Sequence, residues 1–443
     1  MIILWTDALI FVLISVITFV VFSLRKKQHF VRPWQKVSQN RTALVSLVFL
    51  LCFLFVGVLD SVHFKPSDGL NKEVISLLDY WASPLREHQE KSYSAPFSVY
   101  AYSKELIATE HGASVWGYPR LKYAGSHLKD VIAEKTSDIL LKAFIGFIKG
   151  TSIIVLIFGG YHFLRKLPLG SNKAVNTVFS ALLFLLAGSY MLIDLSSFYH
   201  VMGTDKVGED VFYQAIKSIR TGLVIGTLTT LIMLPLAVLF GILAGFFRGW
   251  VDDVIQYIYT TLNSIPGVLL IAASILMVQV YMANHQEQFT SLVARADMRL
   301  LFLCLILGVT SWTGLCRLLR AETLKLREME YVQAARALGV PRYMILYRHI
   351  LPNVMHIVLI SIVLDFSALV LAEAVLSYVN IGVDPTTYSW GNMINGARLE
   401  MARDPIVWWS LLASFIFMFS LVLAANLFAD AVRDAFDPRR KPS

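Results

Sequence analysis

The stretch EYVQAARALGVPRYMILYRHILPN, residues 330–353, stands inside a chain that is otherwise dominated by long apolar runs. Residues 330–338 are mostly strong helix formers. Gly339 follows where a left-handed cap would end that helix, and Pro341 suits the start of another. The pattern therefore predicts a short helix, a sharp turn and a second helix.

This element offers a small, partly charged surface. Arg336 is expected to be exposed, and Ala334 and Ala335 are small enough to let another protein approach closely. On residue physics alone an ordinary connecting hairpin is favoured over a docking element, because a local fold does not by itself specify a function. Both interpretations stay open at this point.

Composition places the chain in a membrane. Of its 443 residues 56% are hydrophobic and only 16% are charged, against about 25% charged residues in an average soluble domain. The predicted fold is therefore an all-α integral membrane protein. About nine apolar runs have the length of roughly 20 residues that a crossing helix needs. They lie near residues 8–24, 43–59, 143–164, 177–198, 219–246, 264–283, 300–318, 355–378 and 406–429.

Charge distribution sets the expected orientation. The net charge of +8 is spread over short basic clusters beside apolar runs, which is typical of cytoplasmic loops and not of a nucleic-acid-binding domain. The loops 25–41, 165–173, 319–354 and 430–443 are therefore predicted to lie inside. The amino terminus and residues 60–142 are predicted to lie outside. The first span has no small-residue cleavage pattern, so we expect a retained anchor.

Residues 60–142 form the one long loop. The segment is polar but rich in aromatic residues such as Tyr93, Tyr100 and Trp116, which argues against a disordered linker. A small folded cap is expected, with a loosely packed flap as the alternative. A cap on the outer side would contact an entering ligand or its carrier, and a purely structural scaffold is the competing interpretation.

Two ionisable residues fall inside one predicted span. A charge at the bilayer centre costs at least about 2.5 kcal/mol unless it faces protein or water. Asp365 lies near the midpoint of 355–378, and Glu373 lies eight residues further. This spacing corresponds to about 80° around a helix, so both can border one broad face. They are candidates for a translocation path, with carboxylates paired to a neighbouring helix as the alternative.

Other residue types carry weaker signals. Gly241, Gly245 and Gly249 recur at every fourth position, which would let a neighbouring helix approach closely, although glycine is common in membrane helices anyway. The three cysteines fall within or at the end of apolar spans, so we infer no disulfide and no metal site. No catalytic motif occurs. The loop histidines are interpreted as solvated: His29, His63, His88, His111 and His127.

The 330–353 stretch resembles the EAA signature of ABC importer permeases, which reads Glu-Ala-Ala, three residues, Gly, and a spacer ending in Leu-Pro. In that family the element is the coupling helix, which inserts into a cleft of a separate ATPase subunit. In this chain Gln333 replaces the Glu, a change that keeps length and hydrogen bonding but removes a charge. The resemblance implies that ATPase coupling rests on Glu330, Tyr331, Gln333, Ala334, Ala335, Gly339, Leu351 and Pro352.

Further stretches resemble the dipeptide, oligopeptide and nickel permease group, and its second permease subunit in particular. They are MGTDKVGEDVF (202–212), GFFRGWVDDVI (245–255), AEAVLSYVNIGVDPTTYSWGNMI (372–394) and AVRDAFDPRR (431–440). The resemblance implies a type I importer permease core at 200–443. Residues 1–199 are then an N-terminal extension that carries extra spans and the loop 60–142.

The resemblance also implies partners. A homologous permease subunit would complete a central path, two ATPase subunits would bind ATP and Mg²⁺, and an external binding protein would deliver a peptide. The sequence contains neither GxxxxGKS nor GxxxxGKT, so we expect no cofactor in this chain and no ATP hydrolysis by it. The expected location is the bacterial cytoplasmic (inner) membrane, with multiple passes in contact with lipid.

Other functions remain open. Antimicrobial peptides and nickel chelates use similar permeases, and the sequence does not separate them from di- or oligopeptides. A stand-alone secondary transporter would show inverted repeats and broken midplane helices, which are not found in the sequence, and would leave 330–353 unexplained. A membrane enzyme or sensor would need catalytic or signalling residues that the sequence does not show.

Overall fold

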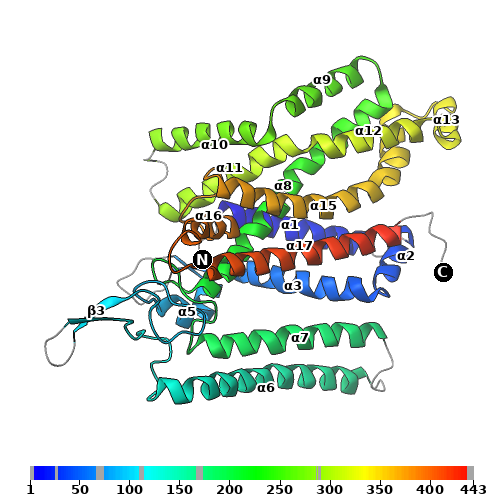
Figure 1. Cartoon of the computed structure of the whole chain (residues 1–443). Helices are drawn as coiled ribbons and strands as arrows, with labels where there is room; N and C mark the ends of the chain where they lie inside the picture. Colours follow the sequence, from blue (N-terminus) through cyan, green and yellow to red (C-terminus); the bar gives the residue numbers. More distant parts are fainter. Residues whose placement is uncertain are drawn as a thin grey trace. The chain divides into compact units, whose positions relative to one another are not determined.

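The computed structural model describes residues 4–24, 28–65, 74–108, 114–165, 173–285, 287 and 291–436 (Figure 1). The chain divides into two compact units. Unit 1 comprises Met1–Ile2, Ser38–Thr221 and Tyr388–Ala424, and unit 2 comprises Ile3–Val37, Gly222–Thr387 and Ala425–Ser443. The boundary between 1–199 and 200–443 stays a prediction.

Unit 1 combines long helices with a small α/β segment. Its elements are α3 (Arg41–Ser61), β1 (His63–Phe64), β2 (Ile75–Ser76), α4 (Leu77–Trp81), α5 (Ser83–Glu87), β3 (Glu105–Ala108), β4 (Ser114–Gly117), α6 (Val131–Arg165), α7 (Lys173–Ser196) and α16 (Trp390–Glu400). β1 pairs antiparallel with β2, and β3 pairs antiparallel with β4. Two helices, α8 (Val211–Phe247) and α17 (Trp409–Phe436), begin in unit 1 and end in unit 2.

Unit 2 is helical in its described part. Besides the ends of α8 and α17, its elements are α1 (Trp5–Leu24), α2 (Gln28–Val37), α9 (Trp250–Ser264), α10 (Gly267–Asn284), α11 (Leu292–Ser311), α12 (Thr313–Arg327), α13 (Glu330–Ala337), α14 (Arg342–Ile345), a π-helical turn (Leu346–Ile350) and α15 (Leu351–Tyr378). The all-α expectation for the membrane-crossing part is therefore confirmed.

Seven described helices are long and apolar enough to cross a membrane: Arg41–Ser61, Val131–Tyr161, Lys173–Ser196, Val211–Phe247, Gly267–Asn284, Arg342–Tyr378 and Trp409–Phe436. Seven of the nine predicted spans are confirmed by this criterion. The predicted span 8–24 falls on α1, where Trp5–Val16 qualifies only as a shorter apolar helix. The predicted span 300–318 is wrong as a single helix, because α11 ends at Ser311 and α12 begins at Thr313.

Charged residues near the start of α11 explain why this helix fails the criterion, and two of them are bonded within unit 2. Asp297 accepts hydrogen bonds from the backbone N–H of Thr6, at 3.3 Å, and from the Thr6 hydroxyl, so it provides an acceptor for the first turn of α1. Arg299 Nη1 lies 3.4 Å from the Asp384 carboxylate. Hydropathy counts these charges against a span, whereas pairing lowers their cost in the fold.

Glycines let α6 and α7 run closely side by side (Figure 1). A Cβ added at Gly146 would come within 2.7 Å of Met191 Cα, and one at Gly150 within 2.7 Å of Ala187 Cα. Only a residue without a side chain allows so close an approach. The two helices therefore form a tightly packed pair.

Loop 60–142 is folded in its described parts. Val99, Leu128 and Tyr199 are buried together in one hydrophobic cluster. The Tyr93 hydroxyl donates a hydrogen bond to Glu400 Oε1 at 3.2 Å, which joins the loop to the end of α16. The loop is thus a small domain packed on other parts of unit 1, and the loosely packed alternative is wrong for these residues.

This burial decides how the predicted orientation is best tested. Ser94 is fully buried, so a thiol placed there would be shielded on either side of the membrane, whereas Ser126 is exposed. With the three native cysteines replaced, we expect a membrane-impermeant thiol reagent to label Ser126→Cys in intact cells. Ser171→Cys, which falls outside the described residues, should react only after lysis, because basic loops stay inside. The reverse labelling pattern would invert the orientation.

Candidate functional site

A sharp turn separates α13 from α14, and Gly339 makes it possible. Gly339 adopts φ +77°, in the left-handed region that residues with a Cβ avoid. Its N–H donates to the Arg336 carbonyl at 3.1 Å. The Val340 N–H donates to the Ala335 carbonyl, also at 3.1 Å. These two bonds are those of a Schellman cap, and Pro341 follows as the residue before α14, so the predicted helix–turn–helix is confirmed.

The second helix of this element contains a π-helical turn. The Leu351 N–H donates to the Leu346 carbonyl, five residues back instead of four. Pro352 has no N–H, and in a regular α-helix its ring would collide with the carbonyl four residues earlier. A wider turn just before the proline provides room for the ring, so the helix continues through the Leu-Pro pair.

The inner face of the 319–354 loop is anchored in the core of unit 2. Val332, Ile345, Ile350 and Val354 are completely buried. They belong to one hydrophobic cluster that also contains buried residues of α8 and α12. Burial of apolar surface is the main force that holds such elements together. The loop therefore packs directly against α8 and α12.

The opposite side of the loop exposes large apolar residues. Leu338, next to the turn, is 83% exposed, and the Tyr343 and Tyr347 rings are exposed on the following helix. We call this surface the loop face and define it as Met329, Tyr331, Leu338, Tyr343 and Tyr347. Several exposed aromatic and aliphatic side chains within one short polar segment are typical of a protein-docking surface.

The predicted coupling residues divide between the two sides of the loop. Those exposed are Glu330, Tyr331, Gln333, Ala334, Gly339 and Pro352, while Leu351 is half-buried. Ala335 is buried, so the expectation that both alanines offer room for a partner is wrong for one of them. The Gln333 side chain donates to the Glu328 carbonyl at 3.2 Å. This hydrogen bond stabilises the connection between α12 and α13.

Arginines connect the loop to the ends of α8 and α9. The Arg336 guanidinium lies 5.3 Å from the centre of the Phe246 ring. Arg327 Nη1 donates to the Phe246 carbonyl at 2.9 Å. Arg320 makes two parallel hydrogen bonds to the Asp252 carboxylate, at 2.6 and 2.8 Å, the strong bidentate geometry of this pair. The loop is thus fixed to its neighbours by polar as well as apolar contacts.

Two of the three spaced glycines create a close helix contact. A Cβ at Gly241 would come within 2.8 Å of the Cys316 carbonyl oxygen, and one at Gly245 within 2.6 Å of Thr323 Cβ. The predicted close approach is therefore confirmed between α8 and α12. It is wrong for Gly249, which has open space around it and adopts φ +60° in the turn before α9.

Asp365 and Glu373 differ in their surroundings on α15. Glu373 is only 2% exposed, and its Oε1 accepts a hydrogen bond from the Ser377 hydroxyl at 2.7 Å. Asp365 is partly exposed. Glu373 has the burial and bonding of a structural carboxylate, whereas the Asp365 side chain is partly accessible at the surface of this chain. The path role of both stays a prediction.

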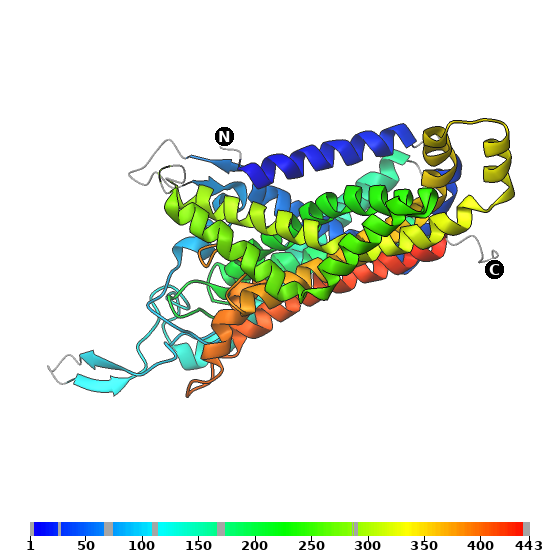
Figure 2. The same ribbon diagram turned by 90° about the horizontal axis from the view of Figure 1, so that it is seen from above.

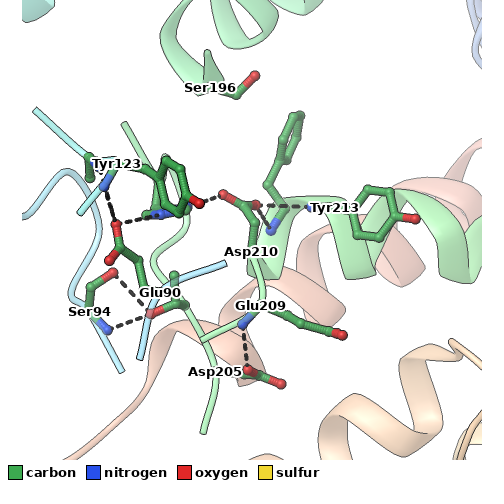
Figure 3. A network of polar contacts seen from close by, with 12 residues as sticks. Glu90, Ser94, Tyr123, Ser196, Asp205, Glu209, Asp210 and Tyr213 are labelled. Carbon is green, nitrogen blue, oxygen red and sulfur yellow. Dashed lines mark hydrogen bonds and ion pairs between the residues drawn. The ribbon is translucent and has the colours of Figure 1, made fainter. Parts of the chain in front are cut away.

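A buried charge cluster in unit 1 is absent from the sequence-based expectations (Figure 3). His200 Nδ1 lies 2.6 Å from Asp210 Oδ2, and His200 Nε2 lies 3.7 Å from Glu90 Oε1. Glu90 also accepts hydrogen bonds from the backbone N–H groups of Lys122 and Tyr123, at 2.9 and 2.8 Å. One buried glutamate of loop 60–142 thus joins the loop to the segment before α8.

The charges in this cluster stabilise one another. Burial alone would lower the pKa of His200, but its hydrogen bond to Asp210 and the nearby negative charges of Asp210 and Glu90 outweigh this effect and raise the pKa from 6.5 to about 9. Burial would raise the pKa of Glu90, but the ionic contact with His200 and the hydrogen bonds from backbone N–H groups outweigh this effect and lower the pKa from 4.5 to about 2. At neutral pH the cluster therefore contains the His200 imidazolium and the ionised Glu90 carboxylate.

A second buried ion group links loop 60–142 to the first turns of α8. Lys217 Nζ lies 2.6 Å from Asp60 Oδ1 and 2.8 Å from Asp79 Oδ1. The Tyr213 hydroxyl donates to the same Asp79 oxygen at 2.7 Å. The local signal for these groups is the density of charged residues around 200–217, but their partners lie more than 100 residues away in sequence.

The loop histidines are less uniform than expected. His63 is buried, so its interpretation as a solvated residue is wrong. His127 Nε2 is 2.8 Å from Asp138 Oδ2, and His88 stacks on Tyr123. The side chains of His29 and His111 fall outside the described ones. Within the described residues no cluster of three or more His, Cys, Asp or Glu side chains suits a metal ion.

Comparison with known proteins finds related permeases. The family profile described as "Binding-protein-dependent transport system inner membrane component" matches residues 237–442. A glutathione transport system permease protein of Pectobacterium atrosepticum is 30% identical over 242 residues, which cover 55% of this chain and 73% of that protein. A dipeptide transport system permease protein of Lactococcus lactis is 31% identical, over 54% of this chain and 64% of that protein.

An oligopeptide transport system permease protein of Mycobacterium tuberculosis is 28% identical over 283 residues, which cover 60% of this chain and 91% of that protein. The matched segments cover 54–60% of this chain in these two relatives. The profile match begins after the whole of loop 60–142.

The charge cluster predicts how stability depends on pH. A raised pKa means that the folded state holds a proton more tightly, so the His200 contribution is complete below about 6.5 and is lost as pH rises to about 9. The Glu90 contribution is complete above about 4.5 and is lost as pH falls to about 2. In detergent, we expect the unfolding temperature of the protein to be highest between about pH 4.5 and about pH 6.5, where both contributions are complete. His200→Gln should flatten the alkaline decline, and Glu90→Gln the acid decline. An unchanged alkaline decline in His200→Gln would contradict the assignment.

Proposed function

Because the chain belongs to the family of binding-protein-dependent transport system inner membrane components, we propose that it is the permease subunit of an ATP-driven importer of di- or oligopeptides. It is a multi-pass protein of the inner membrane. The peptide substrate is supported by the names of its relatives, which are permease proteins of glutathione, dipeptide and oligopeptide transport systems.

The observation that carries this proposal is the loop face beside the Gly339 turn. It combines exposed Leu338 and tyrosine rings with an inner side that is buried against α8 and α12. A partner that pushes on such a surface moves the attached helices as a rigid body, which is a common form of conformational switching. We assign this surface to a separate ATPase subunit.

The remaining partners follow from this assignment. Nucleotide chemistry belongs to two ATPase subunits that bind ATP and Mg²⁺, since the 443-residue sequence has no phosphate loop. A homologous permease subunit would complete the translocation path, and an external binding protein would deliver the peptide. The chain itself contributes no catalytic residue and no cofactor in this proposal.

Asp365 is proposed to line the translocation path. It is partly exposed on α15, in contrast to the buried and hydrogen-bonded Glu373. A carboxylate inside a membrane helix is costly against lipid but stable in a water-filled passage. There it would attract the positive amino terminus of a peptide, and weak pairing of about 1 kcal/mol or less would still permit release.

Gly339 provides the test of ATPase coupling. An L-residue in the left-handed region costs about 1–2 kcal/mol, so we expect Gly339→Val to distort the turn and reduce peptide uptake more than ATP hydrolysis in the reconstituted complex. Gly339→Asn is the matched control, because asparagine tolerates this conformation, and it should retain most of the coupling. Equal uptake per ATP in Gly339→Val and the unmodified complex would exclude the coupling role.

Asp365 is tested by comparing substrates. We expect Asp365→Asn to assemble normally and to import cationic peptides up to about fivefold more slowly, the equivalent of about 1 kcal/mol. Peptides with a blocked, neutral amino terminus should be affected little. Glu373→Gln is the control and should instead lower the yield of folded complex, because it alters a buried hydrogen-bonded group. Equal slowing of all peptides by Asp365→Asn would exclude the path role.

A further inference from the structure

The β3–β4 hairpin of loop 60–142 has exposed apolar side chains on both faces. Cross-strand pairing places Leu106 opposite Trp116 and Ile107 opposite Val115. Leu106 is 59% exposed, Trp116 is 66% exposed and Val115 is 57% exposed. A two-stranded hairpin is marginally stable by itself in water, and large exposed apolar patches usually mark interaction sites.

The base of this hairpin is firmly mounted. The Ala101 N–H donates to the Pro119 carbonyl at 2.8 Å, and the Leu121 N–H donates to the Val99 carbonyl at 2.9 Å. The segment before β3 and the segment after β4 are therefore also paired by backbone hydrogen bonds. Arg120 Nη2 donates to the Leu128 carbonyl at 2.6 Å. The hairpin is thus held as an extended arm and not as a free loop.

The segment that follows β4 contacts the buried charge cluster. The backbone N–H groups of Lys122 and Tyr123 donate to the Glu90 carboxylate. Figure 3 labels Glu90 and Tyr123 in this cluster. Glu90 Oε1 in turn lies 3.7 Å from His200 Nε2, in the segment before α8. The base of the hairpin is therefore connected to the segment before α8 through buried charged groups.

The direction of the hairpin selects the class of partner. In Figure 1 it extends beyond the ends of α6 and α7, away from both helices, and Figure 2 shows the same arm projecting from the rest of loop 60–142. The two helices are long and apolar enough to cross a membrane. An arm that continues outward from their ends stands away from the lipid surface, so its apolar side chains would meet a soluble macromolecule.

We propose that the β3–β4 hairpin, through Leu106, Ile107, Val115 and Trp116, is a docking arm for the external binding protein. This inference rests on the proposed function and adds the place where the partner binds. The family description names dependence on a binding protein, and loop 60–142 is predicted to lie on the side where such a protein arrives. The family profile does not cover the arm, so the arm would add a contact to the binding-protein site.

The test uses the complete importer in lipid nanodiscs and a purified peptide-binding protein that supports uptake by the unmodified complex. We expect the double substitution Leu106→Ser and Trp116→Ser to weaken binding of that protein about tenfold or more, as loss of an apolar anchor does. Uptake at saturating binding protein should stay unchanged. Ile132→Ser is the matched control, since Ile132 is also apolar and 93% exposed but lies at the start of α6. The Ile132→Ser complex should bind the binding protein with the same affinity as the unmodified complex.

A photo-crosslinking residue at Leu106 in the otherwise unmodified chain removes any dependence on folding of the double variant. It should crosslink to the binding protein during uptake. Unchanged affinity in the double variant, or crosslinks only to lipid or to a second copy of the chain, would overturn the docking arm. If no peptide-binding protein supports uptake by the unmodified complex, the proposed function itself fails, which is a separate result.

Discussion

Close contact between α8 and α12 is the constraint on which the site depends. Two helix backbones can approach this far only where no Cβ stands between them, and Gly241 and Gly245 provide such positions against Cys316 and Thr323. This contact places the 319–354 loop beside the end of α8, where Arg327 donates to the Phe246 carbonyl and Arg336 lies over the Phe246 ring. A protein that docked on the loop face would thus act on the membrane helices, because the loop packs against α8 and α12.

A second constraint ties loop 60–142 to the start of α8. Burying Lys217 or His200 alone would be costly, and each is stabilised by two carboxylates at 2.6–3.7 Å. One carboxylate of the His200 group and both of the Lys217 group come from the part of the chain before residue 142. Loop 60–142 is therefore an integral part of unit 1. Removing it would leave buried positive charges without all their partners, so deletion tests its structural role together with any binding role.

Local features were predictable from sequence because their causes are local. Gly339 and Pro341 predicted the turn correctly, since backbone preferences act within a few residues. Continuous apolar runs predicted seven of the spans. The recurrence of glycine at every fourth position also predicted a close helix contact at Gly249, and this prediction was wrong. Gly249 instead adopts a left-handed backbone conformation in the turn before α9. The π-helical turn was not foreseen, although Pro352 is its physical reason.

Features that depend on distant pairing could not be predicted. Nothing near Glu90 indicates His200 as its partner, and the burial of His63 depends on how a long loop folds. The partners of Asp297 and Arg299 also lie elsewhere in unit 2, so these contacts could not be read from the local sequence. The coupling residues were placed by resemblance, and the structure adds which of them face outward.

The central claim is that the loop face docks on a separate ATPase. The most direct measurement is photo-crosslinking from Leu338, the most exposed large residue of that face, in intact cells, followed by mass spectrometry of the crosslinked chain. The account predicts a crosslink to a protein that carries a GxxxxGKS or GxxxxGKT phosphate loop, dependent on the presence of that subunit. Crosslinks only within this chain or to lipid, with the complex otherwise assembled, would contradict it.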